Sequence, residues 1–171
     1  GMPLDNMSML KPFLLMSMII PSALECAPGS YELTLTKLAG DAEKEVLGLE
    51  TVEEQMGAID SFSQAELAEM LLETVENFDE TKLEFAQIVE VYKKNDANAL
   101  HELIQDSMEE NSIENFDEVM LNNRNKIWIG RIETFAREKP TFFAVGGGHL
   151  GGEQGVLALL KAAGFTLTAI Y

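Results

Sequence analysis

The residue best suited to do chemistry in this 171-residue chain is His149, which lies within a glycine-rich run. The run 146–152 reads GGGHLGG and follows the apolar segment 141–145, TFFAV. A histidine after a strand can bind a metal or act as a general base near neutral pH, and flanking glycines let the backbone approach a ligand closely. We therefore expect a ligand or catalytic site here, with a histidine in a plain surface loop as the alternative.

Glycine-rich turns between a strand and a helix also bind phosphates in many proteins, so nucleotide binding is the alternative function of this loop. The spacing of Gly146, Gly147 and Gly148 matches neither the P-loop nor the dinucleotide-binding motif. Glu153, in the expected first turn of the next helix, would repel a phosphate while complementing the helix dipole. The three glycines are thus expected to bring backbone close to a ligand or cofactor other than a nucleotide.

Two further charged residues, Glu50 and Arg124, occupy positions of interest. The segment 45–50 (EVLGLE) is expected to be a strand, which places Glu50 at its C-terminal end, where ligand sites form in open α/β sheets. Thr51 and Glu54 then form a capping box that starts a helix. Arg124, in the run NNRN, could orient a carboxylate or an anionic intermediate, and an exposed polar patch is the alternative interpretation.

The other histidine and the single cysteine are interpreted as structural residues. His101 begins HELIQ, which is close to the zinc-protease helix motif, but Gln105 stands where that motif needs its second histidine. Cys26 cannot form an internal disulfide, and a free cysteine is more often a small buried residue than a nucleophile.

The net charge of −17 is concentrated in the middle of the chain. Residues 41–120 carry 4 basic and 23 acidic side chains, whereas residues 121–171 carry 6 basic and 3 acidic ones. A surface of this kind repels polyanions, so neither nucleic acid nor an anionic membrane is expected as a partner. The acids alternate with apolar residues, which is typical of the solvated faces of several helices.

Helical patterns dominate most of the sequence. Residues 7–20 are expected to form a buried helix that ends at Pro21, and the apolar run around it falls short of the ~20 residues that a membrane helix needs. Residues 31–39 fit a helix or a strand, and we favour a helix. The pattern is helical throughout 63–139, which predicts a helical layer inserted into the domain.

The last part of the sequence changes character. The apolar run 141–145, a helix over 153–163 and a strand over 165–170 predict two parallel strands joined by a right-handed crossover. Together with the strand near residue 47, they predict an α/β fold, with a partial mixed or parallel sheet and the helical layer inserted before its last strands. We expect one domain over residues 1–171.

Several stretches together resemble the TraB/GumN family, whose members include the Tiki metal-dependent peptidases. The resemblance covers nearly the whole chain and is most specific in its last thirty residues. Within it, Gly146 to His149 is similar to the second of the family's two G-x-x-H motifs. The stretches are LKPFLL at 10–15, GLETVEEQ at 48–55, NNRN at 122–125 with Trp128 after it, and AVGGGHLGGEQGVLALLKAAGF at 144–165.

The resemblance implies a divalent-metal-dependent hydrolase that acts on peptides, with Mn, Co or Zn as the cofactor. It implies that His149 and Glu50 serve as metal ligands or base, with Glu53 or Glu54 near them and Arg124 in support. The family's first G-x-x-H is not found, because residues 1–40 contain no histidine. The chain therefore resembles the C-terminal portion of the family domain, lacking one edge of the sheet and one metal ligand.

A hydrolytic metal needs about three protein ligands and an open position for water, so we expect weak or no hydrolysis from this chain. The alternative function is a non-catalytic protein that binds a peptide or small ligand in the same cleft. A homo-oligomer is a further alternative, because another copy of the chain can cover an exposed strand edge.

Overall fold

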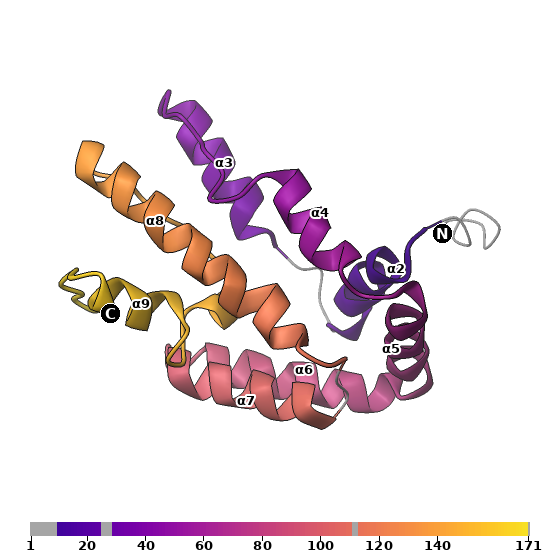
Figure 1. Cartoon of the computed structure of the whole chain (residues 1–171). Coiled ribbons are helices and arrows are strands. Elements are labelled where there is room, and N and C mark those ends of the chain that lie inside the picture. The colour runs from indigo at the N-terminus through magenta and orange to yellow at the C-terminus, as the bar shows by residue number, and fades with distance from the viewer. Residues whose placement is uncertain (1–9, 25–28, 111–112, 171) are drawn as a thin grey trace.

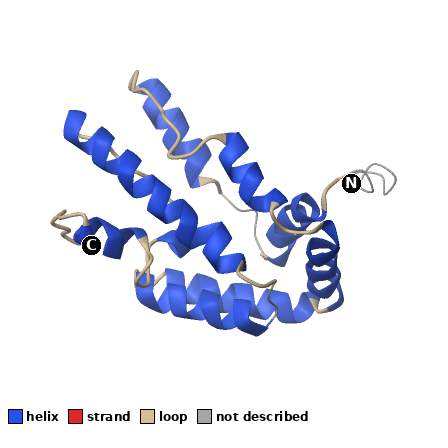
Figure 2. Ribbon diagram, viewed as in Figure 1, coloured by secondary structure: helices blue, strands red, loops and turns tan. Residues whose placement is uncertain are grey.

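Helices make up the regular structure of the computed structural model, which describes residues 10–24, 29–110 and 113–170 (Figures 1 and 2). Within these ranges there is no β-strand. In chain order the elements are α2 (Pro12–Ile19), η1 (Ile20–Ala23), α3 (Tyr31–Asp41), α4 (Val52–Asp60), α5 (Gln64–Glu76), α6 (Phe78–Tyr92), α7 (Ala97–Glu110), η2 (Glu118–Asn122), α8 (Asn123–Glu138), η3 (Gly147–His149) and α9 (Val156–Ala162).

The predicted α/β fold is wrong for the residues that the structure describes. The segments expected as strands, 45–50, 141–145 and 165–170, are irregular, and no ladder of main-chain hydrogen bonds joins them. A strand exists only when its N–H and C=O groups pair with a neighbouring strand, so extended backbone without such a partner is not part of a sheet. The predicted parallel strand, helix and strand unit is therefore also wrong.

The predicted helices, by contrast, are confirmed where local signals define them. Residues 31–39 form a helix, α3. The capping box of Thr51 and Glu54 starts α4, and the equivalent pair, Ser63 and Glu66, starts α5. In each box the hydroxyl oxygen accepts from the N–H of the glutamate, whose side chain accepts in return from the N–H of the capping residue.

The N-terminal helix differs from its prediction. The described part, α2, runs on through Pro21 into η1 instead of ending there. It is not buried on several sides, because Leu14 and Met18 are exposed. Residues 7–9 and Cys26 lie outside the described residues. No helix in the described ranges is long and apolar enough to cross a membrane, as predicted.

Two separate hydrophobic clusters hold the helices together. The first contains Phe62, Leu67 and Ile113 and is contacted by side chains of α2, α5 and η2. The second contains Trp128 and Ile132 of α8 and Val156 of α9. Six partly buried apolar side chains pack against this second cluster: Leu49, Ile129, Phe143, Val145, Leu150 and Leu160. It therefore joins α8 and α9 to the ends of the two extended segments that lead into Glu50 and the glycine-rich loop.

Candidate functional site

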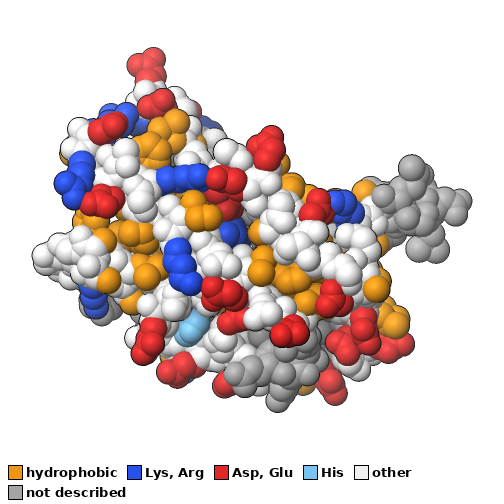
Figure 3. Space-filling model, in the orientation of Figure 1, with side chains coloured by type: hydrophobic (Ala, Val, Ile, Leu, Met, Phe, Trp, Pro, Cys, Tyr) orange, Lys and Arg blue, Asp and Glu red, His pale blue; other side chains and the backbone are white. Residues whose placement is uncertain are grey.

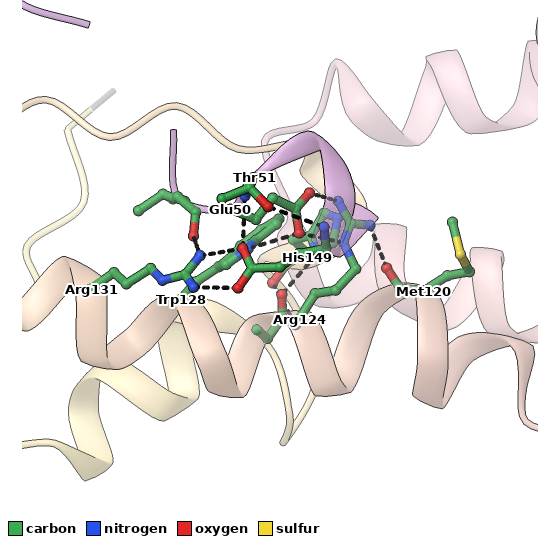
Figure 4. Close-up of polar contacts among 10 residues, drawn as sticks. Glu50, Thr51, Met120, Arg124, Trp128, Arg131 and His149 are labelled. Atoms are coloured by element: carbon green, nitrogen blue, oxygen red, sulfur yellow. Dashed lines mark hydrogen bonds and ion pairs between the residues drawn. The ribbon is translucent and has the colours of Figure 1, made fainter. Parts of the chain in front are cut away.

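Glu50 and Arg124 form a bidentate ion pair across the site (Figure 4). Arg124 Nε donates to Glu50 Oε2 at 3.0 Å and Nη2 donates to Oε1 at 2.6 Å. The two side chains are 13% and 16% exposed, so the pair is mostly desolvated. A bidentate guanidinium and carboxylate pair is strong and directional, which fixes the position of the carboxylate.

A wide π-helical turn, η2, places Arg124 at the start of α8. Its guanidinium Nη1 also donates to the carbonyl oxygen of Met120, four residues earlier, at 2.6 Å. π-Helical turns are uncommon and often occur at functional sites, where they re-aim the side chains that follow. Here the turn ends at Asn122, the first residue of the run NNRN, whose third residue is Arg124.

Trp128 links Glu50 to His149. Its indole Nε1 donates to Glu50 Oε2 at 3.2 Å, and its ring lies 4.4 Å from the imidazole of His149, centroid to centroid. The guanidinium carbon of Arg124 lies 5.0 Å from the same indole ring, in cation–π range. Glu50 thus accepts three hydrogen bonds, which leaves about one of its roughly four acceptor positions open.

Asn125 selects the tautomer of His149. Its amide nitrogen donates to the carbonyl oxygen of Gln154 at 2.9 Å and to that of His149 at 3.4 Å. These two acceptors orient the amide, so Oδ1 is the atom that faces His149 Nδ1 at 2.7 Å. An amide oxygen can only accept, so Nδ1 carries the proton and Nε2 keeps its lone pair.

His149 is held in its neutral form. The side chain is buried between α8 and the loop, and this burial lowers the pKa of His149 to about 4. The positive charge of Arg124 lowers the pKa further, while the negative charge of Glu50 acts in the opposite direction. At neutral pH the imidazole is therefore a lone-pair donor at Nε2, the state that binds a metal or accepts a proton.

The glycines of the loop allow it to pack closely against α6 and α7. A Cβ on Gly147 would lie 2.9 Å from Leu100, and a Cβ on Gly148 would lie 3.3 Å from Ile104. Gly152 has a φ of +79°, and a Cβ there would collide with His101. The space beside Gly147 and Gly148 is thus filled by side chains of the protein.

The first turn of α7 holds the far end of the same loop. Asn98 Oδ1 accepts from the main-chain N–H of Gly152 at 3.1 Å. His101, which was predicted to be an ordinary helix residue, lies against Gly152, and its Nδ1 is buried without a hydrogen-bond partner in the described residues. The loop that carries His149 is therefore anchored at one end by α8 and at the other by α7.

The remaining predicted site residues, Glu53 and Glu54, lie in the first turn of α4. Glu54 accepts from Arg131 Nη1 at 2.8 Å and from the N–H of Thr51, and these hydrogen bonds hold its pKa down to about 2. Glu53 is exposed. Arg131 also donates to the carbonyl oxygen of Leu49 at 2.6 Å, which joins segment 45–50 to α8. The carboxylate of Glu54 is thus engaged by Thr51 and Arg131.

The donors available for a metal are few in the part of the chain that the structure describes. No group of three or more histidine, cysteine, aspartate or glutamate side chains could hold a metal ion there. The two candidates are Nε2 of His149 and the open position on Glu50. Two donors are one fewer than the about three that a hydrolytic metal site takes from protein. This donor set does not hold such a metal by itself.

Sequence reasoning did not single out Asn125, although it lies beside Arg124. Asn125, Trp128 and Ile132 are the buried residues of α8, at helical spacing on one face. A polar residue aligned with two large apolar ones on the buried face of a helix must find buried hydrogen-bond partners. The spacing of Asn125, Trp128 and Ile132 is therefore the sequence feature that indicates the burial of Asn125.

The chain matches the family model described as TraB/PrgY/gumN family over residues 1–169. The match covers essentially its whole length, so the chain belongs to the TraB/PrgY/gumN family. Searches of the curated proteins and of the solved structures found no match. The predicted family resemblance is confirmed.

Proposed function

We propose that this chain supplies part of the centre of a metal-dependent hydrolase that acts on peptides. The observation that carries the proposal is the hydrogen bond between His149 Nδ1 and Asn125, which selects the tautomer of the neutral imidazole that has its lone pair on Nε2. A fixed tautomer held by a hydrogen bond to the opposite ring nitrogen is the usual arrangement of a histidine that binds a metal or takes a proton from water. Family membership supports the same assignment.

The ion pair of Arg124 with Glu50 fixes a carboxylate in the centre. Arg124 and Trp128 hold the carboxylate in one orientation, so it enters any reaction without reorganising. A divalent metal such as Mn, Co or Zn would supply Lewis acidity to such a centre. Because His149 and Glu50 offer two donors between them, we expect the chain to bind these metals weakly and to hydrolyse peptides at or near background.

Metal binding by matched variants tests this proposal. Equilibrium dialysis with Zn²⁺, Co²⁺ and Mn²⁺ compares the wild-type chain with His149→Gln and Glu50→Gln. His101→Gln and Glu53→Gln serve as controls, since one replaces the other histidine and the other an exposed nearby glutamate. We expect weak binding that the first pair of variants removes and the control pair keeps. Binding that is the same in His149→Gln as in the wild type would contradict the proposal.

Hydrolysis is measured on a defined mixture of unstructured peptides, by mass spectrometry, with and without each metal. We expect cleavage at background. Robust metal-dependent cleavage that disappears in His149→Gln would overturn the inference that the described donors are insufficient, while leaving the assignment of His149 intact.

A second candidate function is a protein that binds a peptide or small ligand without catalysis. The observation that favours it is the engagement of Glu50 with three donors, which leaves little capacity for a metal. Titration of the same peptides in the presence of a chelator separates the two functions. Peptide binding that survives both the chelator and His149→Gln would favour the binding protein.

A further inference from the structure

In the part of the chain that the structure describes, two segments, 45–50 and 141–145, lack main-chain pairing, although the carbonyl oxygen of Leu49 accepts from Arg131. In the described residues neither segment makes a backbone-to-backbone hydrogen bond. A row of free N–H and C=O groups on extended backbone is a template for pairing with another strand. Both segments lead directly into the site, because one ends at Glu50 and the other is followed by the loop of His149.

One side of these segments is already packed, as in the strands of a sheet. Phe143 and Val145 alternate with Phe142 and point to the cluster of Trp128, whereas Phe142 is 78% exposed. On the other segment, Leu49 reaches the same cluster while Val46 and Leu47 are exposed. Large apolar side chains on the outer side of extended backbone indicate a surface that a further layer covers.

Helix α3, which precedes segment 45–50, also exposes apolar side chains that no other element covers in the described residues. It has 11 residues and no buried residue, and Tyr31, Leu33 and Leu38 are exposed. An isolated helix shorter than ~12–15 residues is marginal in water and is usually stabilised by packing of an apolar face. In Figure 1, α3 projects at the edge of the molecule. The exposed apolar side chains of α3 therefore indicate a surface that packs against a partner.

The exposed area is large for a chain of this size. The accessible surface is 11928 Å². A folded monomer of the same mass, 18.9 kDa, exposes about 8,300 Å² by the usual scaling of surface with mass. The surplus of roughly 3,600 Å² exceeds the ~1,000–2,500 Å² that each partner buries in an obligate homodimer. Enough surface is thus exposed for a stable dimer.

Charge identifies the part of the surface where two copies can meet. Residues 41–120 carry most of the negative charge, and Figure 3 shows acidic side chains over much of one face. Residues 141–152, by contrast, contain no Asp, Glu, Lys or Arg. The acids of segment 45–50 are neutralised within the chain, Glu45 by Lys139 and Glu50 by Arg124. Two copies can therefore pair here without like-charge repulsion.

We propose that residues 141–145 pair antiparallel with the same residues of a second copy of this chain, across a twofold axis, with α3 and segment 45–50 at the edges of the interface. Antiparallel pairing is self-complementary, as a twofold interface requires, and antiparallel strands satisfy each other's main chains. Pairing fixes segment 141–145, which leads into the loop of His149. The dimer therefore orders the segment next to His149, whether or not the centre is hydrolytic.

Sedimentation equilibrium of the wild-type chain and two matched variants tests the dimer. Phe142→Glu places a charge at the centre of the proposed interface. Leu83→Glu is the control, because it places the same charge at another exposed apolar position, 66% exposed, on α6 and outside the proposed interface. We expect a wild-type dimer, a rise of at least about tenfold in the dissociation constant for Phe142→Glu, and no change for Leu83→Glu.

Amide hydrogen exchange keeps the test informative if a variant loses structure. In an antiparallel pair every second residue of a strand donates its N–H to the partner, so alternate amides of 142–145 should exchange slowly in the wild-type dimer. Dilution to monomer should make them exchange fast while α5 stays protected. A monomer at all concentrations would overturn the proposal. So would a dimer in which the amides of 142–145 remain unprotected, or one that Leu83→Glu dissociates as readily as Phe142→Glu.

Discussion

The Oδ1 atom of Asn125 lies 2.7 Å from Nδ1 of His149, and the amide nitrogen of the same asparagine donates to two main-chain carbonyl oxygens. One buried side chain thus fixes the tautomer of the histidine and the course of the loop that carries it. Asn125 is 1% exposed, so water cannot replace these partners.

Asn125→Ala should destabilise the fold by about 2–4 kcal/mol, because it leaves a buried imidazole N–H and buried carbonyls without partners. Urea unfolding followed by circular dichroism measures the change. Asn123→Ala is the matched control, since Asn123 lies on the exposed side of the same helix. Equal effects of the two substitutions would show that Asn125 does not have this role.

Arg124→Ala should raise the pKa of His149. Burial is the main cause of the depressed pKa, and the positive charge of Arg124 adds to it. Removing the guanidinium removes this repulsion and leaves Glu50 to favour the imidazolium. A nuclear magnetic resonance titration of the imidazole gives the pKa directly. Arg137→Ala, at an exposed position of α8, should leave the pKa unchanged, and an unchanged pKa in Arg124→Ala would refute the assigned interaction.

Stability should depend on pH through His149. Its pKa is about 4 in the folded chain and lies near 6.5 when the chain is unfolded, so the unfolded state binds more protons between these values. The stabilising effect of neutral His149 is complete above about pH 6.5 and is lost as the pH falls toward 4. The free energy of unfolding of the wild type should fall more steeply over this window than that of His149→Gln. Parallel curves for the two proteins would contradict the depressed pKa.

Gly152→Ala should destabilise the chain by about 1–3 kcal/mol, because the new methyl group would collide with His101 at a positive φ. Gly57→Ala supplies the contrast. Gly57 lies inside α4 with no atom near its would-be Cβ, so the same substitution should stabilise the chain by roughly 0.5–1 kcal/mol. Opposite signs in urea unfolding are expected. A neutral Gly152→Ala would show that the loop is not held tightly against α7.

The features that sequence reasoning predicted well are those that neighbouring residues determine. The capping boxes at Thr51 and Ser63 each depend on a pair three residues apart, and both form. The sheet depends on pairing between distant segments, and none of the extended segments pairs in the described residues. The alternation of Phe142 and Phe143 is real, but alternation shows which side is packed and does not supply a partner strand.

Only part of the candidate site was predicted, because its contacts join residues that are far apart in the sequence. Glu50 and Arg124 were each noted from local context, and the structure brings them together although they are 74 positions apart. Glu54 was grouped with them because it is close in sequence, yet its carboxylate binds Arg131. Asn125 was missed because an asparagine on a helix is commonly exposed, and its burial follows from the packing of α8 against the glycine-rich loop.

The tautomer of His149 and its availability to a metal are tested most directly by a long-range proton–nitrogen correlation spectrum of the histidine side chains at neutral pH, recorded before and after addition of Zn²⁺. We expect a neutral His149 with the proton on Nδ1 and an unprotonated Nε2, whose resonance shifts on addition of the metal in the wild type and in His101→Gln. A proton on Nε2, or an Nε2 resonance that Zn²⁺ leaves unchanged, would contradict this expectation.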